Sequence, residues 1–199
     1  MPYTTLGGEK HTRKGMKVRL HHKDIEELFV ENSYPHQFGS SQEGGVPERI
    51  FSAKLLGGEG NYREIFMENI HIGYGDFHLQ PQWELDFESE METVEMHFAL
   101  QGKTLAEEKG SKRKYQFLDN QHNLIYASNF KGRAFYQAVE IIKVFEVNLM
   151  PTFFERFLPQ SGKSFLYFAK AMERGENTLL SNHNYVITPE MHWVIQEIL

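Results

Sequence analysis

The sequence predicts a mainly β protein that ends in helices, and two observations carry this prediction. From about residue 48 to residue 149, apolar residues alternate with polar ones, and Gly, Asn and Asp interrupt the runs. This pattern is typical of antiparallel strands with one buried face. After Met150, apolar residues recur every three or four positions, which is the spacing of amphipathic helices. We therefore expect a β domain over residues 1–149 and a helical segment over residues 150–199.

The N-terminal arm, residues 1–47, gives the weakest pattern. The stretch KDIEELFVENS is compatible with a short helix. Several turn-forming residues follow it, namely Pro35, Gly39, Gly44, Gly45 and Pro47, and they predict a loop.

Strong alternation marks the central strands. In WELDFE, the residues Trp83, Leu85 and Phe87 alternate with acidic residues, and in VEMHFALQG, Met96 and Phe98 lie two positions apart. Side chains two apart in a strand share a face, so we expect these apolar sets to face one interior. The stretch VEIIKVFEVNL is predicted to be the last long strand, and the mixed-charge run over residues 107–114 is predicted to be a hairpin loop.

Three helices are expected in the segment that follows, at PTFFERFLP, SGKSFLYFAKAMERG and TPEMHWVIQEIL. Gly175 should stop the second, while Thr188 and Pro189 are a favourable N-cap and first residue for the third. No stop signal follows Leu199. We predict that the apolar faces of this segment mediate dimerisation; the alternative is that they pack on their own β domain. The candidate dimerisation residues are Phe165, Phe168, Met172, Met191, Val194, Ile195 and Ile198.

Composition narrows the class of protein. The chain has 199 residues, of which 40% are hydrophobic, so it can bury a substantial core. It has no cysteine, which excludes disulfides and Cys-ligated metals and fits a reducing compartment. No apolar run approaches the roughly 20 residues of a membrane span, and no signal peptide is evident, so we expect a cytoplasmic protein without membrane contact. The net charge of −6 argues against DNA binding by this chain.

The order of segments resembles the N-terminal sensor region of AraC-type transcriptional regulators, in particular the branch that includes siderophore-responsive activators. The residues that carry the resemblance are MHFALQGK, FYQAVEIIKVFEVNLMPTFFERFLP and ITPEMHWVIQEIL, and it covers about residues 60–199. It implies a cupin-like antiparallel β-barrel or sandwich that senses a small-molecule effector and forms a homodimer. DNA binding would then belong to a C-terminal domain that this chain does not contain.

In this interpretation the effector occupies the interior of the barrel. Aromatic and methionine side chains with a few polar groups are what small-molecule pockets use. The same residues could simply be core, and a solid interior would move the sensor site to the barrel mouth or the helical interface. The candidate ligand-binding residues are Phe77, Trp83, Leu85, Phe87, Met96, Phe98 and Tyr126.

No catalytic residue, cofactor or metal site is predicted. Metal-dependent cupins present two histidines as H-x-H together with further ligands, and this chain has no H-x-H. Four histidines, His71, His78, His97 and His122, are scattered over the β region, and His78 and His97 are expected to point outward. Two alternatives stay open: a cupin-type enzyme acting on a small metabolite, and a purely structural dimerisation module.

Overall fold

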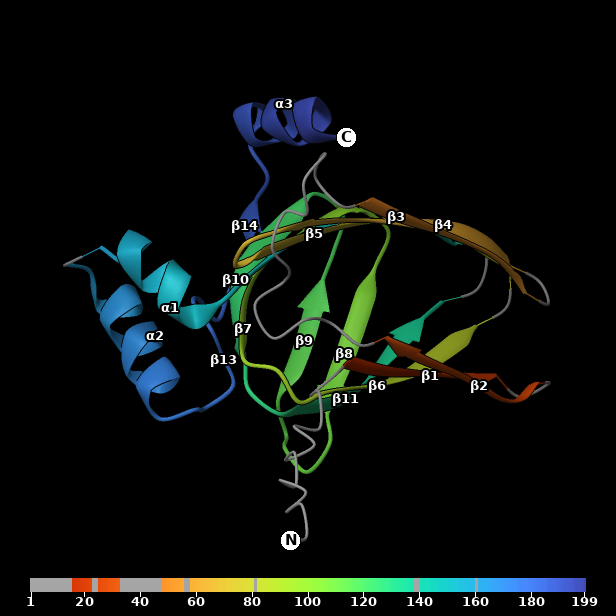
Figure 1. Ribbon diagram of the computed structural model, residues 1–199, viewed down its shortest axis with the longest axis horizontal. Helices are drawn as coiled ribbons and strands as arrows, with labels where there is room; N and C mark the ends of the chain where they lie inside the picture. Colours follow the sequence, from red (N-terminus) through yellow and green to blue (C-terminus); the bar gives the residue numbers. More distant parts are fainter. Residues whose placement is uncertain are drawn as a thin grey trace, which may run out of the picture.

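The computed structural model describes residues 16–22, 25–32, 48–55, 58–80, 82–137, 140–159 and 161–199. Within these ranges the long strands form two antiparallel sheets (Figure 1). The six-stranded sheet has the order β2-β1-β6-β11-β8-β9 and comprises β1 (Met16–His22), β2 (Ile25–Asn32), β6 (Trp83–Ser89), β8 (Thr104–Glu108), β9 (Lys114–Phe117) and β11 (Phe130–Tyr136).

The eight-stranded sheet has the order β13-β10-β7-β12-β5-β4-β3, with β14 also paired to β10. Its strands are β3 (Glu48–Leu55), β4 (Gly58–Met67), β5 (Ile70–Leu79), β7 (Thr93–Gln101), β10 (Gln121–Ala127), β12 (Glu140–Leu149), β13 (Thr178–Leu179) and β14 (Tyr185–Val186). The two sheets do not close into a barrel but face each other as a sandwich. The predicted class, mainly antiparallel β with C-terminal helices, is confirmed.

The eight-stranded sheet is covered on both faces, and this determines which residues lie inside the sandwich. Ala99 packs with Phe117 and Phe130 of the opposite sheet. Its neighbour Phe98 points to the other face of the eight-stranded sheet, the helical side, where the C-terminal helices pack, and it contacts Phe145 and Ile195 there. The expectation that the apolar residues of β6 and β7 face one interior is therefore wrong. Alternation reveals that a strand has an apolar face, but it does not reveal whether that face meets a sheet or a helix.

Strand β12 follows the same arrangement. Phe145 and Leu149 pack on the helical side, whereas Ile142 packs between the sheets with Trp83. The pairing of β12 with β7 shifts register between Lys143 and the next residue. The even-numbered positions of β12 from Ile142 to Asn148 thus face the other sheet.

The arm also differs from expectation. Residues 25–32, expected as a short helix, form strand β2, which pairs antiparallel with β1. Tertiary pairing overrides a weak local helical pattern. The proline- and glycine-containing stretch over residues 33–47 lies outside the described residues.

The helices form where the sequence predicts them. They are α1 (Pro151–Phe154), a following 3-10 helix η1 (Glu155–Phe157), α2 (Lys163–Glu173) and α3 (Pro189–Ile198). Thr188 caps α3, because its Oγ1 accepts a hydrogen bond from the backbone N–H of Met191 at 3.3 Å. Gly175 ends α2 with a φ of 66°, a conformation that glycine adopts without strain. Among the described residues, no helix has the length and apolar character needed to cross a bilayer.

The helices lie on the outer face of the eight-stranded sheet (Figure 1). Phe168 of α2 is fully buried against Tyr126 and Leu149, and Ile195 of α3 is buried against Ile72. Of the other candidate dimerisation residues, Met172, Met191 and Ile198 are partly buried against the same sheet, Phe165 is half-buried and Val194 is exposed. The β domain of the same chain therefore covers most of these faces.

Candidate functional site

A polar cluster lies between the two sheets. Glu95 and His97 project from β7, and Glu146 projects from the adjacent strand β12, where it is the register partner of His97. The Nδ1 atom of His97 lies 2.7 Å from Oε1 of Glu95 and 4.0 Å from Oε1 of Glu146. Phe117 of the opposite sheet covers the imidazole, with 4.3 Å between ring centroids. The cluster is thus held on a rigid sheet and shielded by an aromatic ring.

Burial and mutual repulsion shape the protonation of this cluster. Burial, together with the charge of Glu95, raises the pKa of Glu146 to about 7. Burial works to lower the pKa of His97, but the hydrogen bond and charge of Glu95 and the charge of Glu146 outweigh it, so the pKa of His97 is raised. The protonation of Glu146 is therefore linked to that of His97.

Two tyrosines border the cluster. The hydroxyl of Tyr62 on β4 donates a hydrogen bond of 3.2 Å to Oε2 of Glu146. Gly73 of β5 makes this reach possible, because a Cβ at that position would collide with the Tyr62 hydroxyl. Burial and the nearby charges of Glu146 and Glu95 raise the pKa of Tyr136 to about 12, so Tyr136 stays protonated.

A second buried polar cluster lies on β4 and β5, on the same face of the eight-stranded sheet as the first. Oε1 of Glu64, which is fully buried, lies 3.0 Å from Nε2 of His71, and its Oε2 lies 3.3 Å from a guanidinium nitrogen of Arg49. Asn148 approaches Nδ1 of His71 at 3.3 Å. Glu64 is thus paired on both oxygens and acts as a structural anchor between β3, β4 and β5.

The first cluster has the donor set of a cation site. One ligand atom from each of Glu95, His97 and Glu146 lies within 4.8 Å of the others. An imidazole with two carboxylates suits Mn, Fe or Zn ions. The nitrogen of His97 that faces both carboxylates is Nδ1, so this atom would be the imidazole ligand. The three residues therefore fit a divalent metal ion.

This cluster was not found from the sequence. Instead of H-x-H, β7 carries Glu95-x-His97, an arrangement that also puts two ligands on one face of a strand. The expectation that His97 points outward is wrong, because β7 turns its apolar side to the helices and its polar side inward. His78 is exposed as expected, and His71 is buried in its pair with Glu64. His122 lies elsewhere, on the helical side of β10.

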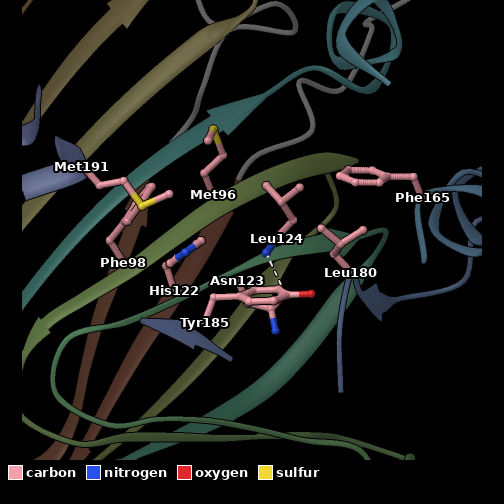
Figure 2. Close-up of a pocket in the computed structure, with 9 residues that line it drawn as sticks. All are labelled: Met96, Phe98, His122, Asn123, Leu124, Phe165, Leu180, Tyr185 and Met191. Carbon is pink, nitrogen blue, oxygen red and sulfur yellow. Dashed lines mark hydrogen bonds between the residues drawn. The ribbon is translucent and has the colours of Figure 1, made fainter. Parts of the chain in front are cut away.

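An apolar cavity of about 310 Å³ lies on that helical side (Figure 2). In Figure 2, Met191 and Phe98 lie at one end, and Phe165 and Leu180 lie at the other. The wall thus combines residues of β7 and β10 with residues of α2, α3 and the segment between them. The complete lining is Met96, Phe98, His122, Asn123, Leu124, Phe165, Leu180, Tyr185 and Met191.

The seven candidate ligand-binding residues do not meet at one site. Phe77, Trp83, Leu85 and Phe87 belong to the side of their strands that faces between the sheets. Met96 and Phe98 line the cavity on the opposite face of the eight-stranded sheet. Tyr126 is 1% exposed in the core under α1 and α2.

No protein-family profile and no curated protein match the chain. Similar solved structures include the AraC-like transcriptional activator CuxR, with 11% identity, a TM-score of 0.40, and 76% of this chain and 50% of that chain covered. A variant oxalate decarboxylase of Bacillus subtilis has 14% identity and a TM-score of 0.37, with 71% and 39% covered. A cupin superfamily protein of Desulfitobacterium hafniense has 12% identity and a TM-score of 0.31, with 56% and 83% covered.

These similarities are between folds. The neighbours include regulators and enzymes, so they do not assign an activity, and they do not support the siderophore-responsive branch. The chain spans about half the length of CuxR. It also spans about half the length of a further similar structure, which comes from a study of DMSP lyases. The class that the fold defines is a two-sheet antiparallel β-sandwich with helices packed on one outer face.

Proposed function

We propose that this chain is a small-molecule sensor domain of an AraC-type transcription regulator. The observation that carries the proposal is the position of the cavity, which lies between the rigid sheet and the helices. A ligand there touches Phe98 and Leu124 of the sheet together with Phe165 of α2 and Met191 of α3. The occupied site would be at the helical interface rather than in the interior of the sandwich.

The proposed mechanism is a shift between helix positions. A ligand changes an equilibrium only if it binds one arrangement better than another. Contacts with both the sheet and two helices satisfy this condition, because any sliding of α2 or α3 changes the cavity wall. In the AraC-type arrangement, the helices would transmit that bias to a separate DNA-binding domain, in a cytoplasmic homodimer.

Filling the cavity with a side chain tests this coupling without a known ligand. Leu180→Phe adds a ring to the lining and imitates partial occupancy. We expect slower amide hydrogen exchange in α2 and α3, by about threefold or more, with unchanged exchange in β5. Leu118→Phe is the matched control, because Leu118 is exposed and does not line the cavity. Exchange in α2 and α3 that is the same in both variants and in the wild type contradicts the proposal.

A cupin-type metalloenzyme is the second candidate function, and the polar cluster between the sheets favours it. Glu95, His97 and Glu146 would hold the ion, which would supply Lewis-acid activation of a bound oxygen. Tyr62 would donate a hydrogen bond within this site, as it does to Glu146 here. Metal binding is the first requirement of this alternative.

A further inference from the structure

The chemistry of the cavity wall limits what the sensor can bind, and this inference rests on the proposed function. Six of the lining residues are purely apolar or thioether side chains, and the lining contains no Asp, Glu, Lys or Arg. An ion placed there would lose part of its hydration without gaining a counter-charge. The wall therefore selects against charged ligands.

Three lining residues carry polar side-chain atoms, and one of them is already used by the fold. The amide nitrogen of Asn123 donates to the backbone oxygen of Ser181 at 2.9 Å and to Oδ1 of Asn184 at 3.0 Å. Its Oδ1 accepts from the backbone N–H of Leu124 at 2.9 Å. This leaves His122 and Tyr185 to interact with a ligand.

His122 is the polar group best placed for recognition. Its ring stacks on Phe98, with centroids 5.4 Å apart, and lies 5.7 Å from the ring of Tyr185. These contacts fix the plane of the imidazole (Figure 2). Within the described ranges, its ring nitrogens make no hydrogen bond to the protein. Burial lowers the pKa of His122, so the ring is neutral and offers one donor and one acceptor.

Size and shape narrow the ligand further. An apolar protein cavity of about 150 Å³ accommodates benzene, so a cavity twice as large fits roughly two fused or linked rings. The ring of His122 stacks on Phe98 and is tilted against Tyr185, and together these rings offer an aromatic wall for a flat molecule. Methionine side chains at 96 and 191 adapt to ligand edges.

From these observations we infer that the cavity binds a neutral, flat and mostly apolar molecule of one or two rings, held by a single hydrogen bond to His122. The apolar body would lie among Phe98, Phe165 and Met191. One hydroxyl or carbonyl group on the ligand would meet the neutral imidazole.

Three naphthalene compounds test the ligand class by isothermal titration calorimetry at neutral pH. 2-Naphthol is neutral with one hydroxyl, naphthalene lacks the hydroxyl, and 2-naphthoate is charged. We expect 2-naphthol to bind about tenfold or more tightly than 2-naphthoate, because the charge is not compensated. We expect it to bind several-fold more tightly than naphthalene, which is the net value of one hydrogen bond. In His122→Phe the preference over naphthalene should disappear, while in His78→Phe, a matched exposed control, it should remain.

The outcomes separate the two proposals. If 2-naphthoate binds within threefold of 2-naphthol, if 2-naphthol does not bind, or if His122→Phe keeps the preference, the ligand class is wrong. The Leu180→Phe exchange experiment uses no ligand, so it still reports on sensing in each of those cases. If 2-naphthol binds selectively while helix exchange does not respond to Leu180→Phe, the ligand class stands and the sensor function fails. The wild-type comparison of three compounds needs no variant, so a variant that fails to fold does not prevent the test.

Discussion

His97 and Glu95 lie two residues apart on β7, and their side chains meet inside the sandwich at 2.7 Å. Because residues two apart in a strand point the same way, the sequence E-x-H places an imidazole and a carboxylate side by side. Glu146 approaches from β12, and Phe117 closes the cluster from the opposite sheet. A carboxylate pair in such a place is unfavourable unless a proton or a cation separates the charges.

The first prediction concerns a cation at this cluster. Chelator-treated protein should be stabilised when Mn²⁺ or Zn²⁺ is added. At an ion concentration about 100 times Kd, the free energy of unfolding should rise by about 2.7 kcal/mol. For a chain of this size that corresponds to a Tm increase of about 5–10 °C. Differential scanning calorimetry measures this, with Glu95→Gln and Glu146→Gln expected to abolish the increase.

Glu68→Gln is the control for this prediction, since Glu68 is exposed outside the cluster. An equal Tm increase in wild type, Glu95→Gln and Glu68→Gln would place the bound ion elsewhere. A wild-type Tm that does not respond to either ion removes the support for the metalloenzyme alternative.

The second prediction is a pH dependence of stability in the presence of chelator. The folded protein holds a proton on Glu146 up to pH about 7, whereas an unfolded glutamate loses it near pH 4.5. Between these values the folded state binds more protons, so its stability must fall as the pH rises. The raised pKa of His97 acts in the same direction, because the stability it contributes is lost as the pH rises through its folded value.

Glu146→Gln removes the contribution of Glu146 to this effect. At 1.36 kcal/mol per pKa unit, the variant should gain roughly 2–3 kcal/mol relative to wild type on going from pH 5 to pH 8. Urea denaturation at a series of pH values measures the difference. A wild-type curve that is flat, or that rises over this interval, contradicts the assigned protonation of the cluster.

The helices and most strands could be predicted from the sequence, but the face of the sheet on which each side chain packs could not. The α3 start at Thr188 and Pro189 was predictable because capping is a local property. The side of the sheet to which Phe98 points was not, because it depends on the helices that pack there. The inward direction of His97 depends on the same packing, and the cluster carries E-x-H in place of the H-x-H of metal-dependent cupins. The cavity on the helical side is lined by residues of β7, β10, α2 and α3, which are far apart in the sequence. No local sequence pattern predicts that they lie close together.

The third prediction concerns the buried Glu64–His71 pair. Glu64→Ala removes the carboxylate that contacts Nε2 of buried His71 and the contact with Arg49. Leaving a buried hydrogen-bonding group without one of its partners costs about 1–3 kcal/mol. Urea denaturation should show a loss of this order, and Glu59→Ala, an exposed position on the same strand, should lose less than about 0.5 kcal/mol. Similar losses for the two variants would show that Glu64 is not an anchor.

The fourth prediction tests whether the helices belong to the folded core. Phe168 of α2 is fully buried against the eight-stranded sheet, and its neighbour Tyr167 is 58% exposed. Phe168→Ala should lower the free energy of unfolding by about 3–5 kcal/mol, whereas Tyr167→Ala should change it by less than about 0.5 kcal/mol. If Phe168→Ala is as mild as Tyr167→Ala, the helical segment does not pack on the sheet in solution.

The fifth prediction concerns dimerisation through α3. Most candidate residues pack on the sheet of the same chain, but Trp193 and Val194 are 66% and 47% exposed on α3. They lie next to one another in the chain, and an exposed pair of large apolar side chains is often an interaction surface. In a two-fold dimer both chains contribute the same patch, so one substitution changes the interface at two places. The double variant Trp193→Ser, Val194→Ser should therefore weaken self-association about tenfold or more in sedimentation equilibrium.

The control is Tyr167→Ser, which removes an exposed aromatic side chain from α2. A wild-type chain that stays monomeric at high concentration contradicts the dimer. Equal weakening by Tyr167→Ser would show that the interface is not specific to α3.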